Sequence, residues 1–263
     1  MLLVAHRPAA PLLRFVASAE GYRVPANPTG LHRGLPSRHL TLVVELNGPL
    51  AVGGLSSPVA AHGVVGGLHL RPALIDATQA QEGLQYALTP FGTQLMLGAP
   101  AAELHDWVID LIDLWGEPAV ELIEKLRSAT DWRDRFRMID DALIRRLSAD
   151  MAYPRDEVAE AWRLICASNG RLPMSTVATH VDWGRRHLSE QFRRATGVTP
   201  KQAARIARFE AARRLLLASR RPPLAEVAIR SGFTDQPHLA REWRAFAGCS
   251  VGSWLREELP FVQ

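Results

Sequence analysis

Two sets of residues in this 263-residue chain carry groups that could do chemistry. The first is four histidines near the N-terminus, His32, His39, His62 and His69, whose imidazoles could ligate a metal ion. The second is a series of arginine pairs between residues 171 and 256, which could bind phosphate groups or guanine bases. The two sets point to different functions, a metal centre and a nucleic-acid interface.

The spacing of the histidines does not favour a metal site. It lacks a compact His-x-His pair with a following Glu, and Glu45 comes six residues after His39 with no second histidine beside it. The sequence also contains no Gly-x-Ser-x-Gly motif, phosphate-binding loop or His-Glu-x-x-His motif. Cys166 and Cys249 fit neither a disulfide framework nor a zinc cluster. We therefore expect no catalytic residue, no metal ion and no cofactor.

The charge is distributed unevenly along the chain. The net charge of +4 is the sum of −3 for residues 1–150, with 13 Lys+Arg against 16 Asp+Glu, and +7 for residues 151–263, with 18 against 11. Residues 171–256 alone carry 16 basic and 6 acidic side chains. Such an asymmetry predicts two domains, 1–150 and 151–263, of which the second meets a polyanion.

The basic region contains an internal repeat. Val177-Ala178, His187-Leu188, Phe192 and Gly197 recur as Val227-Ala228, His238-Leu239, Trp243 and Gly248, at an offset of 50 and then 51 residues. Each copy predicts a short helix, a tight turn and a longer basic helix, followed in the first copy by a linker helix over about 201–218. The predicted helices are 175–181 and 185–196 in the first copy, and 224–231 and 236–247 in the second. This order is typical of a helix-turn-helix motif, whose second helix enters the major groove of DNA.

The N-terminal region has a different pattern. To about residue 97, short β-branched runs such as Leu40–Leu46 are separated by Gly and Pro turns, which favours a sandwich or barrel. From Ala101 the apolar spacing becomes helical, and we expect helices through residue 148. These helices could cover the β-rich part or pair between subunits. The expected fold class is α+β, with two domains.

The repeats resemble the DNA-binding domain of the AraC/XylS-type transcription regulators. The likeness rests on Val177–Pro200, on Val227–Leu255 and most strongly on the run from Gly232 to Trp243, GFTDQPHLAREW. The N-terminal half is similar, more loosely, to the sensor domains of one branch of this family, through Leu35-Pro36-Ser37, Gly66-Gly67 and residues 97–104. The resemblance implies a cupin-like β fold for that half.

Positions carried over from the family suggest which side chains meet DNA. The first recognition helix would present Arg185, Arg186, Ser189 and Glu190 to the bases, and the second Gln236, Pro237, Ala240 and Arg241. Four further arginines are expected to contact phosphates: Arg193, Arg194, Arg205 and Arg244. Three positions depart from the family pattern: Gly184 at the first N-cap, Glu190 in place of a basic residue, and Val251 in place of proline. The second motif therefore matches the family better.

The sequence thus predicts a sequence-specific DNA-binding transcription regulator, an activator or a repressor, whose front domain senses an effector or mediates dimerisation. Expected partners are double-stranded DNA and a small-molecule effector, with RNA polymerase and a second copy of the chain as further candidates. Two alternatives stay open: a cupin-type metal-dependent enzyme fused to a DNA-tethering module, and a non-specific architectural protein.

The N-terminus bears on where the protein resides. Ala17-Ser18-Ala19 resembles a signal cleavage site, but Arg14, Pro8 and Pro11 interrupt the apolar stretch before it. The sequence has no run of about 18 apolar residues. We expect a cytoplasmic protein that neither is secreted nor crosses a membrane.

Overall fold

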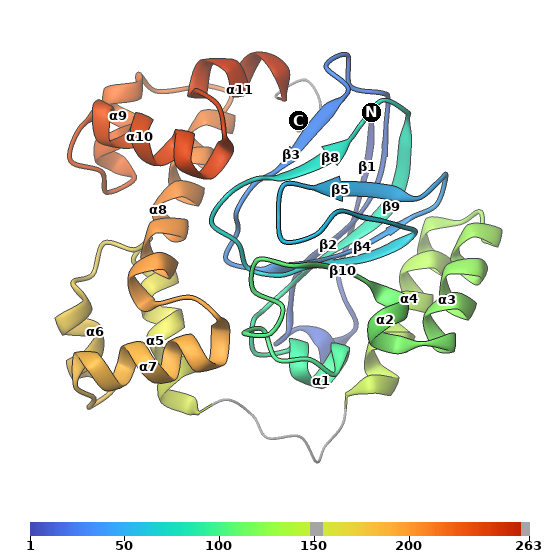
Figure 1. Cartoon of the computed structure of the whole chain (residues 1–263), viewed down its shortest axis with the longest axis horizontal. Coiled ribbons are helices and arrows are strands. Elements are labelled where there is room, and N and C mark those ends of the chain that lie inside the picture. The colour runs from blue at the N-terminus through green and yellow to red at the C-terminus, as the bar shows by residue number, and fades with distance from the viewer. Residues whose placement is uncertain (148–154, 259–263) are drawn as a thin grey trace. The chain divides into compact units, whose positions relative to one another are not determined.

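The computed structural model describes residues 1–147 and 155–258. The chain divides into two compact units (Figure 1). Unit 1 comprises Met1–Gly34, His39–Leu68 and Ala73–Tyr153, and unit 2 comprises Leu35–Arg38, His69–Pro72 and Pro154–Gln263. The predicted α+β class is confirmed, because the strands lie in the N-terminal part of the chain and the C-terminal part is helical. The boundary predicted after residue 150 lies outside the described residues.

Two antiparallel sheets make up the β part of unit 1. The six-stranded sheet has the order β1-β2-β9-β4-β7-β10, and the four-stranded sheet has the order β3-β8-β5-β6. The strands are β1 Leu2–His6, β2 Val16–Val24, β3 Leu31–Gly34, β4 Leu40–Glu45, β5 Leu50–Gly53, β6 Val59–Ala61, β7 Gly63–Gly66, β8 Ala73–Asp76, β9 Gln81–Leu88 and β10 Val108–Asp110.

The two sheets pack face to face around an apolar core. Val43 of β4 and Val64 of β7 meet Leu50 and Val52 of β5 there. Neighbouring residues of β4 point to the opposite face, as the two-residue period of a strand requires. Leu42 on that face is also buried, beside Tyr86 in the register of β4 with β9. A sheet that buries both faces must be covered from outside.

Helices provide that cover. They are α1 Thr93–Leu97, α2 Leu111–Trp115, α3 Glu117–Ser128 and α4 Trp132–Arg146, with a 3₁₀ turn at Ala10–Leu12. Helix α4 lies so close to β2 that a Cβ atom on Gly21 would come within 2.5 Å of the Trp132 ring. On β1, the edge strand beside β2, the His6 ring stacks on Phe136 of α4 at 4.3 Å between ring centroids.

The helix predicted from Ala101 is wrong over its first part. Residues 101–106 form turns, residues 108–110 form β10, and a helix begins only at Leu111. Of the five apolar residues at helical spacing, Leu104, Val108 and Leu111 are buried, whereas Trp107 and Ile112 are exposed. A turn followed by an edge strand buries the same three side chains, because Val108 pairs with Gly66 of β7.

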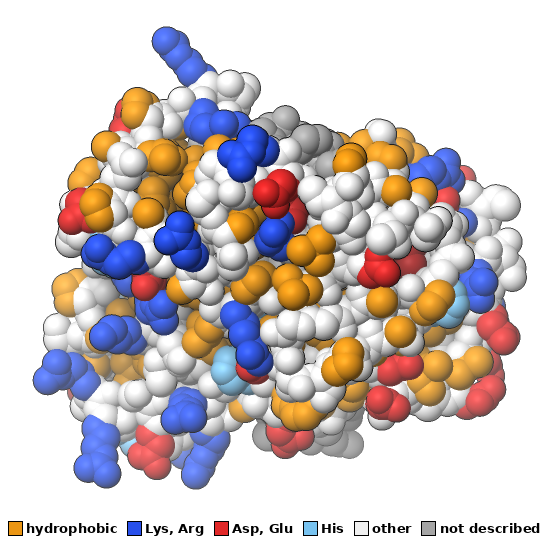
Figure 2. Space-filling model, turned by 45° about the horizontal axis from the view of Figure 1, so that its top comes forward, with side chains coloured by type: hydrophobic (Ala, Val, Ile, Leu, Met, Phe, Trp, Pro, Cys, Tyr) orange, Lys and Arg blue, Asp and Glu red, His pale blue; other side chains and the backbone are white. Residues whose placement is uncertain are grey.

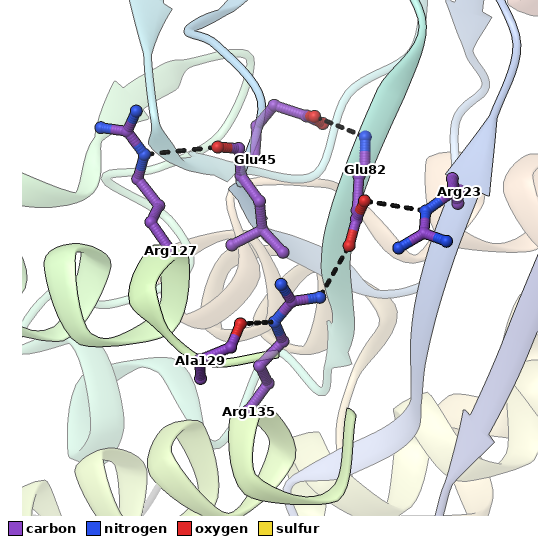
Figure 3. Close-up of polar contacts among 7 residues, drawn as sticks. Arg23, Glu45, Glu82, Arg127, Ala129 and Arg135 are labelled. Atoms are coloured by element: carbon purple, nitrogen blue, oxygen red, sulfur yellow. Dashed lines mark hydrogen bonds and ion pairs between the residues drawn. The ribbon is translucent and has the colours of Figure 1, made fainter. Parts of the chain in front are cut away.

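A network of charged side chains, buried at Arg135 and Glu45 and exposed at Arg23, ties the α3–α4 corner to the six-stranded sheet (Figure 3). The Glu82 carboxylate accepts from Arg23 Nε at 2.8 Å and from Arg135 Nη1 at 2.7 Å. Arg135 Nε also donates to the Ala129 carbonyl between the two helices, at 3.0 Å. Glu45 Oε1 accepts the Glu82 backbone N–H at 2.7 Å, and burial raises the pKa of Glu45. The network fixes the helices on the sheet by directional bonds as well as apolar contact.

The helices of unit 2 follow the predicted repeat. They are α5 Asp156–Ala167, α6 Met174–His180, α7 Arg185–Thr196, α8 Pro200–Leu217, α9 Leu224–Arg230, α10 Gln236–Ala247 and α11 Val251–Glu257. The second helix of each motif, α7 and α10, has the predicted bounds. Helix α8 begins with a capping box, in which Thr199 and Gln202 bond each other's backbone N–H. Val251, where the family pattern has proline, opens α11 behind the N-cap Ser250.

Candidate nucleic-acid interface

The first recognition helix, α7, begins at Arg185 directly after Gly184. Gly184 makes no side-chain cap bond, so the first turn of the helix relies on backbone geometry. Gly197 closes the helix in the left-handed region at φ 80°. Arg185, Arg186 and Glu190 are exposed and Ser189 is half-buried, while Leu188 and Phe192 are buried.

The second recognition helix, α10, has a side-chain cap at its N-terminus, which α7 lacks. The Asp235 carboxylate accepts the His238 backbone N–H at 2.6 Å, and Pro237 stands in the first turn, where its missing N–H leaves no bond unmade. Gly248 closes the helix at φ 69°. The four residues predicted to face the bases are all exposed and lie on one side of α10: Gln236, Pro237, Ala240 and Arg241.

Three of the four predicted phosphate ligands are exposed. Arg193 and Arg194 lie at the end of α7 and Arg244 lies on α10. Arg205 is different, because its guanidinium makes a two-point ion pair with Glu242 at 2.8 and 3.1 Å. A phosphate contact by Arg205 stays a prediction. Such a contact would compete with Glu242 for the same guanidinium group.

Basic side chains gather over the helices of unit 2 (Figure 2). The guanidinium groups of Arg185, Arg186, Arg193, Arg241 and Arg244 make no ion pair with any of the described residues. Their charges are therefore available to an anionic partner, and the positive potential adds over the two motifs.

Three hydroxyl residues and a histidine that the sequence did not single out lie together on α6. Ser175, Thr176, Thr179 and His180 line a shallow hollow on the exposed side of this helix. Hydroxyls of this kind can donate to phosphate oxygens. The second motif has Ala225, Glu226, Ile229 and Arg230 at the equivalent positions of α9. Comparing the exposed faces of the two short helices, rather than their buried anchors alone, could have revealed the difference.

The histidines that opened the metal hypothesis are not brought together. His62 Nδ1 lies 3.1 Å from the Glu45 carbonyl oxygen, and His69 Nδ1 lies 2.5 Å from that of Arg71. Within residues 1–147 and 155–258, no three His, Cys, Asp or Glu side chains form a group that could hold a metal ion. None of the helices described combines the length and hydropathy of a bilayer-spanning segment.

The helices of unit 2 match those of a known family of domains. Residues 177–257 match the family model of a helix-turn-helix domain, which confirms the resemblance drawn from the two repeated motifs. No curated protein matches the chain in sequence.

Solved structures extend the likeness to both units. ToxT from Vibrio cholerae is 10% identical with a TM-score of 0.55, over 91% of this chain and 96% of that chain. ToxT with a bound unsaturated fatty acid is 9% identical, also with a TM-score of 0.55, over 96% and 97%. The DNA-binding domain of AdpA with its target DNA is 27% identical over 40% of this chain and 97% of that chain, with a TM-score of 0.36. The likeness to ToxT shows a shared fold of a β-rich part followed by a helical part.

Proposed function

We propose that this chain, whose residues 177–257 form a helix-turn-helix domain, is a sequence-specific DNA-binding transcription regulator. The observation that carries the proposal is the exposed set on α10, in which Gln236, Ala240 and Arg241 stand on one side of a firmly capped helix. Arg suits guanine, Gln suits adenine, and Ala or Pro can contact a thymine methyl group.

The two recognition helices are proposed to read two successive major grooves. Major grooves on one face of B-DNA recur about every 34 Å, and a rigid linker helix suits such a spacing. Helix α8 spans 18 residues, and its Ile206, Phe209 and Leu216 are completely buried in unit 2. In this arrangement Arg185, Arg186, Ser189 and Glu190 of α7 face the bases of the first groove. Arg193, Arg194 and Arg244 contact phosphates.

Unit 1 is proposed to bind a small-molecule effector or to mediate dimerisation. The fold shared with ToxT supports the first role, since one structure of ToxT holds an unsaturated fatty acid. Titrating candidate effectors while following the melting temperature of the protein and its affinity for DNA tests this role. Sedimentation of the full chain tests the second. A regulator of this kind would act on chromosomal DNA in the cytoplasm. RNA polymerase is a further candidate partner there.

Mapping the bound sites across the genome, together with selection from randomised DNA, tests the main proposal. A recurrent site with two specified segments about one helical turn apart supports it. Binding without a preferred sequence would instead support an architectural protein. Near-stoichiometric iron, manganese or zinc in the purified protein would support the metal-dependent enzyme.

A further inference from the structure

A two-point ion pair joins the linker helix α8 to the second recognition helix α10. Arg205 donates from Nε to Glu242 Oε2 at 2.8 Å and from Nη2 to Oε1 at 3.1 Å. The guanidinium carbon also lies 5.0 Å from the centre of the Phe246 ring, one turn further along α10. Arg205 is thus held on α10 by a carboxylate and an aromatic face.

The pair is half-buried. The side chains of Arg205 and Glu242 are 29% and 19% exposed. A planar guanidinium that bonds a carboxylate at two points fixes the relative orientation of the two groups, which a single exposed contact does not. Arg208, on the next turn of α8, donates from Nη1 to the Gly170 carbonyl at 2.6 Å. The linker helix thus offers Glu242 its two-point contact through Arg205.

Glu242 is adjacent to the residues proposed to read bases. It directly follows Arg241 and comes two residues before Arg244, both exposed. Successive residues of an α-helix are rotated by about 100° around the helix axis. An ion pair that holds the Glu242 side chain in place therefore also fixes the direction in which Arg241 leaves the helix. Base readout by a two-point arginine contact depends on that direction.

The first motif lacks this restraint. Gln191 stands at the position of α7 equivalent to Glu242, and a neutral amide cannot form the same ion pair. Both recognition helices have a buried aromatic anchor, which in α7 is Phe192 stacked on Trp162 at 5.5 Å between ring centroids and in α10 is Trp243. Helix α10 therefore adds an ion pair to the kind of anchor that both helices share.

We propose that Arg205 and Glu242 are positioning residues that set the rotation of α10, so that Arg205 serves readout through Glu242 and not by contacting a phosphate. This inference rests on the proposed DNA-reading function. It predicts that breaking the pair changes which bases are preferred at the segment read by α10 and leaves the segment read by α7 unchanged.

The test uses the full chain with Glu242→Gln and Arg205→Lys, compared with the unaltered protein by selection from randomised DNA and by binding across salt concentrations. Each variant should relax the base preference at the α10 segment and weaken binding to the preferred site about tenfold, equivalent to about 1.4 kcal/mol. The dependence of affinity on salt should be unchanged, because no phosphate contact is lost. Circular dichroism and the unfolding midpoint establish that each variant is folded, and Arg205→Lys gives the same readout where Glu242→Gln is too unstable.

A phosphate role for Arg205 gives the opposite pattern. Glu242→Gln would then free the arginine and leave binding equal or tighter, and Arg205→Ala would lower the salt slope by about 0.9 with base preferences intact. Either result overturns the inference. Glu226→Gln is the matched control, because it breaks an exposed ion pair within α9, from Arg230 Nη1 at 3.1 Å. Equal relaxation in this control would also overturn the inference. An unaltered protein that selects no sequence would refute the proposed function itself.

Discussion

Phe192 of α7 and Trp243 of α10 occupy the same position in the two repeats, 51 residues apart, and both are completely buried. Phe192 stacks on Trp162 of α5, whereas Trp243 packs on Phe209 of α8 at 4.8 Å and on Trp254 of α11 at 5.2 Å between ring centroids. Each recognition helix thus has an aromatic anchor at this position, and the rings that pack on the two anchors come from different helices. The anchor holds the buried face so that the basic face can remain exposed.

Replacing an anchor should destabilise unit 2. We expect Phe192→Ala to lower the free energy of unfolding by about 3–5 kcal/mol, because a buried ring is replaced by a cavity. Urea unfolding followed by circular dichroism measures the loss. Trp183→Ala is the control, since the Trp183 ring is half-buried and should cost less than half as much. A loss below about 1 kcal/mol for Phe192→Ala would contradict the role of the anchor.

Arg241 should determine one base of the site. We expect Arg241→Ala to weaken binding by about 1–3 kcal/mol and to relax the preference at a single position, because a two-point contact to guanine is lost. A binding-site profile from selected DNA measures both effects. Arg230→Ala, which removes an exposed arginine of α9, is the control and should leave the profile as it is. If Arg241→Ala also leaves the profile unchanged, the assignment of Arg241 is wrong.

Arg244 should act on every sequence alike. Loss of one phosphate contact in Arg244→Ala should weaken binding to preferred and random DNA by the same factor and reduce the salt slope by about 0.9. Fluorescence anisotropy at several salt concentrations gives the slope. A loss confined to one preferred base would show that Arg244 reads sequence instead.

Glu82 should make the stability of unit 1 depend on pH. Hydrogen bonds from Arg23 and Arg135 hold the pKa of Glu82 below its ordinary value. A carboxylate with a depressed folded-state pKa stabilises the fold above its unfolded-state pKa of about 4.3, and this contribution is lost as the pH falls through the folded-state value. Glu82→Gln should therefore cost about 2–4 kcal/mol at pH 7 and progressively less below about pH 4.3.

Urea unfolding at a series of pH values measures this difference. Glu121→Gln is the control, because it breaks an exposed ion pair with Lys125 in which both side chains are more than half exposed. Its cost should be about 0.5 kcal/mol or less. A cost for Glu82→Gln that stays constant down to pH 3 would mean that the carboxylate's charge does not hold the network together.

The repeat in unit 2 could be predicted closely because its signals are local. Gly197 and Gly248 end the two recognition helices, and Asp235 caps the second. Each of these features acts within one or two helical turns. The recurrence of the buried residues after 50 or 51 positions then aligns the two copies. The bounds of α7 and α10 therefore follow from the sequence to the residue.

Features that depend on distant residues could not be predicted. The strand at Val108–Asp110 exists because β7 lies beside it, and its apolar spacing suits a helix equally well. The strands β1 to β3 have no strong alternation to distinguish them from loops. The ion pair of Arg205 with Glu242 could not be predicted either, because nothing near Arg205 in the sequence reveals a partner 37 residues away.

Sequence discrimination separates a specific regulator from an architectural protein, and competition between selected and random DNA at one stated salt concentration measures it. We expect the full chain to bind its selected site about 10³-fold or more tightly than random DNA of the same length. A ratio near one, with binding that simply follows salt concentration, would contradict it.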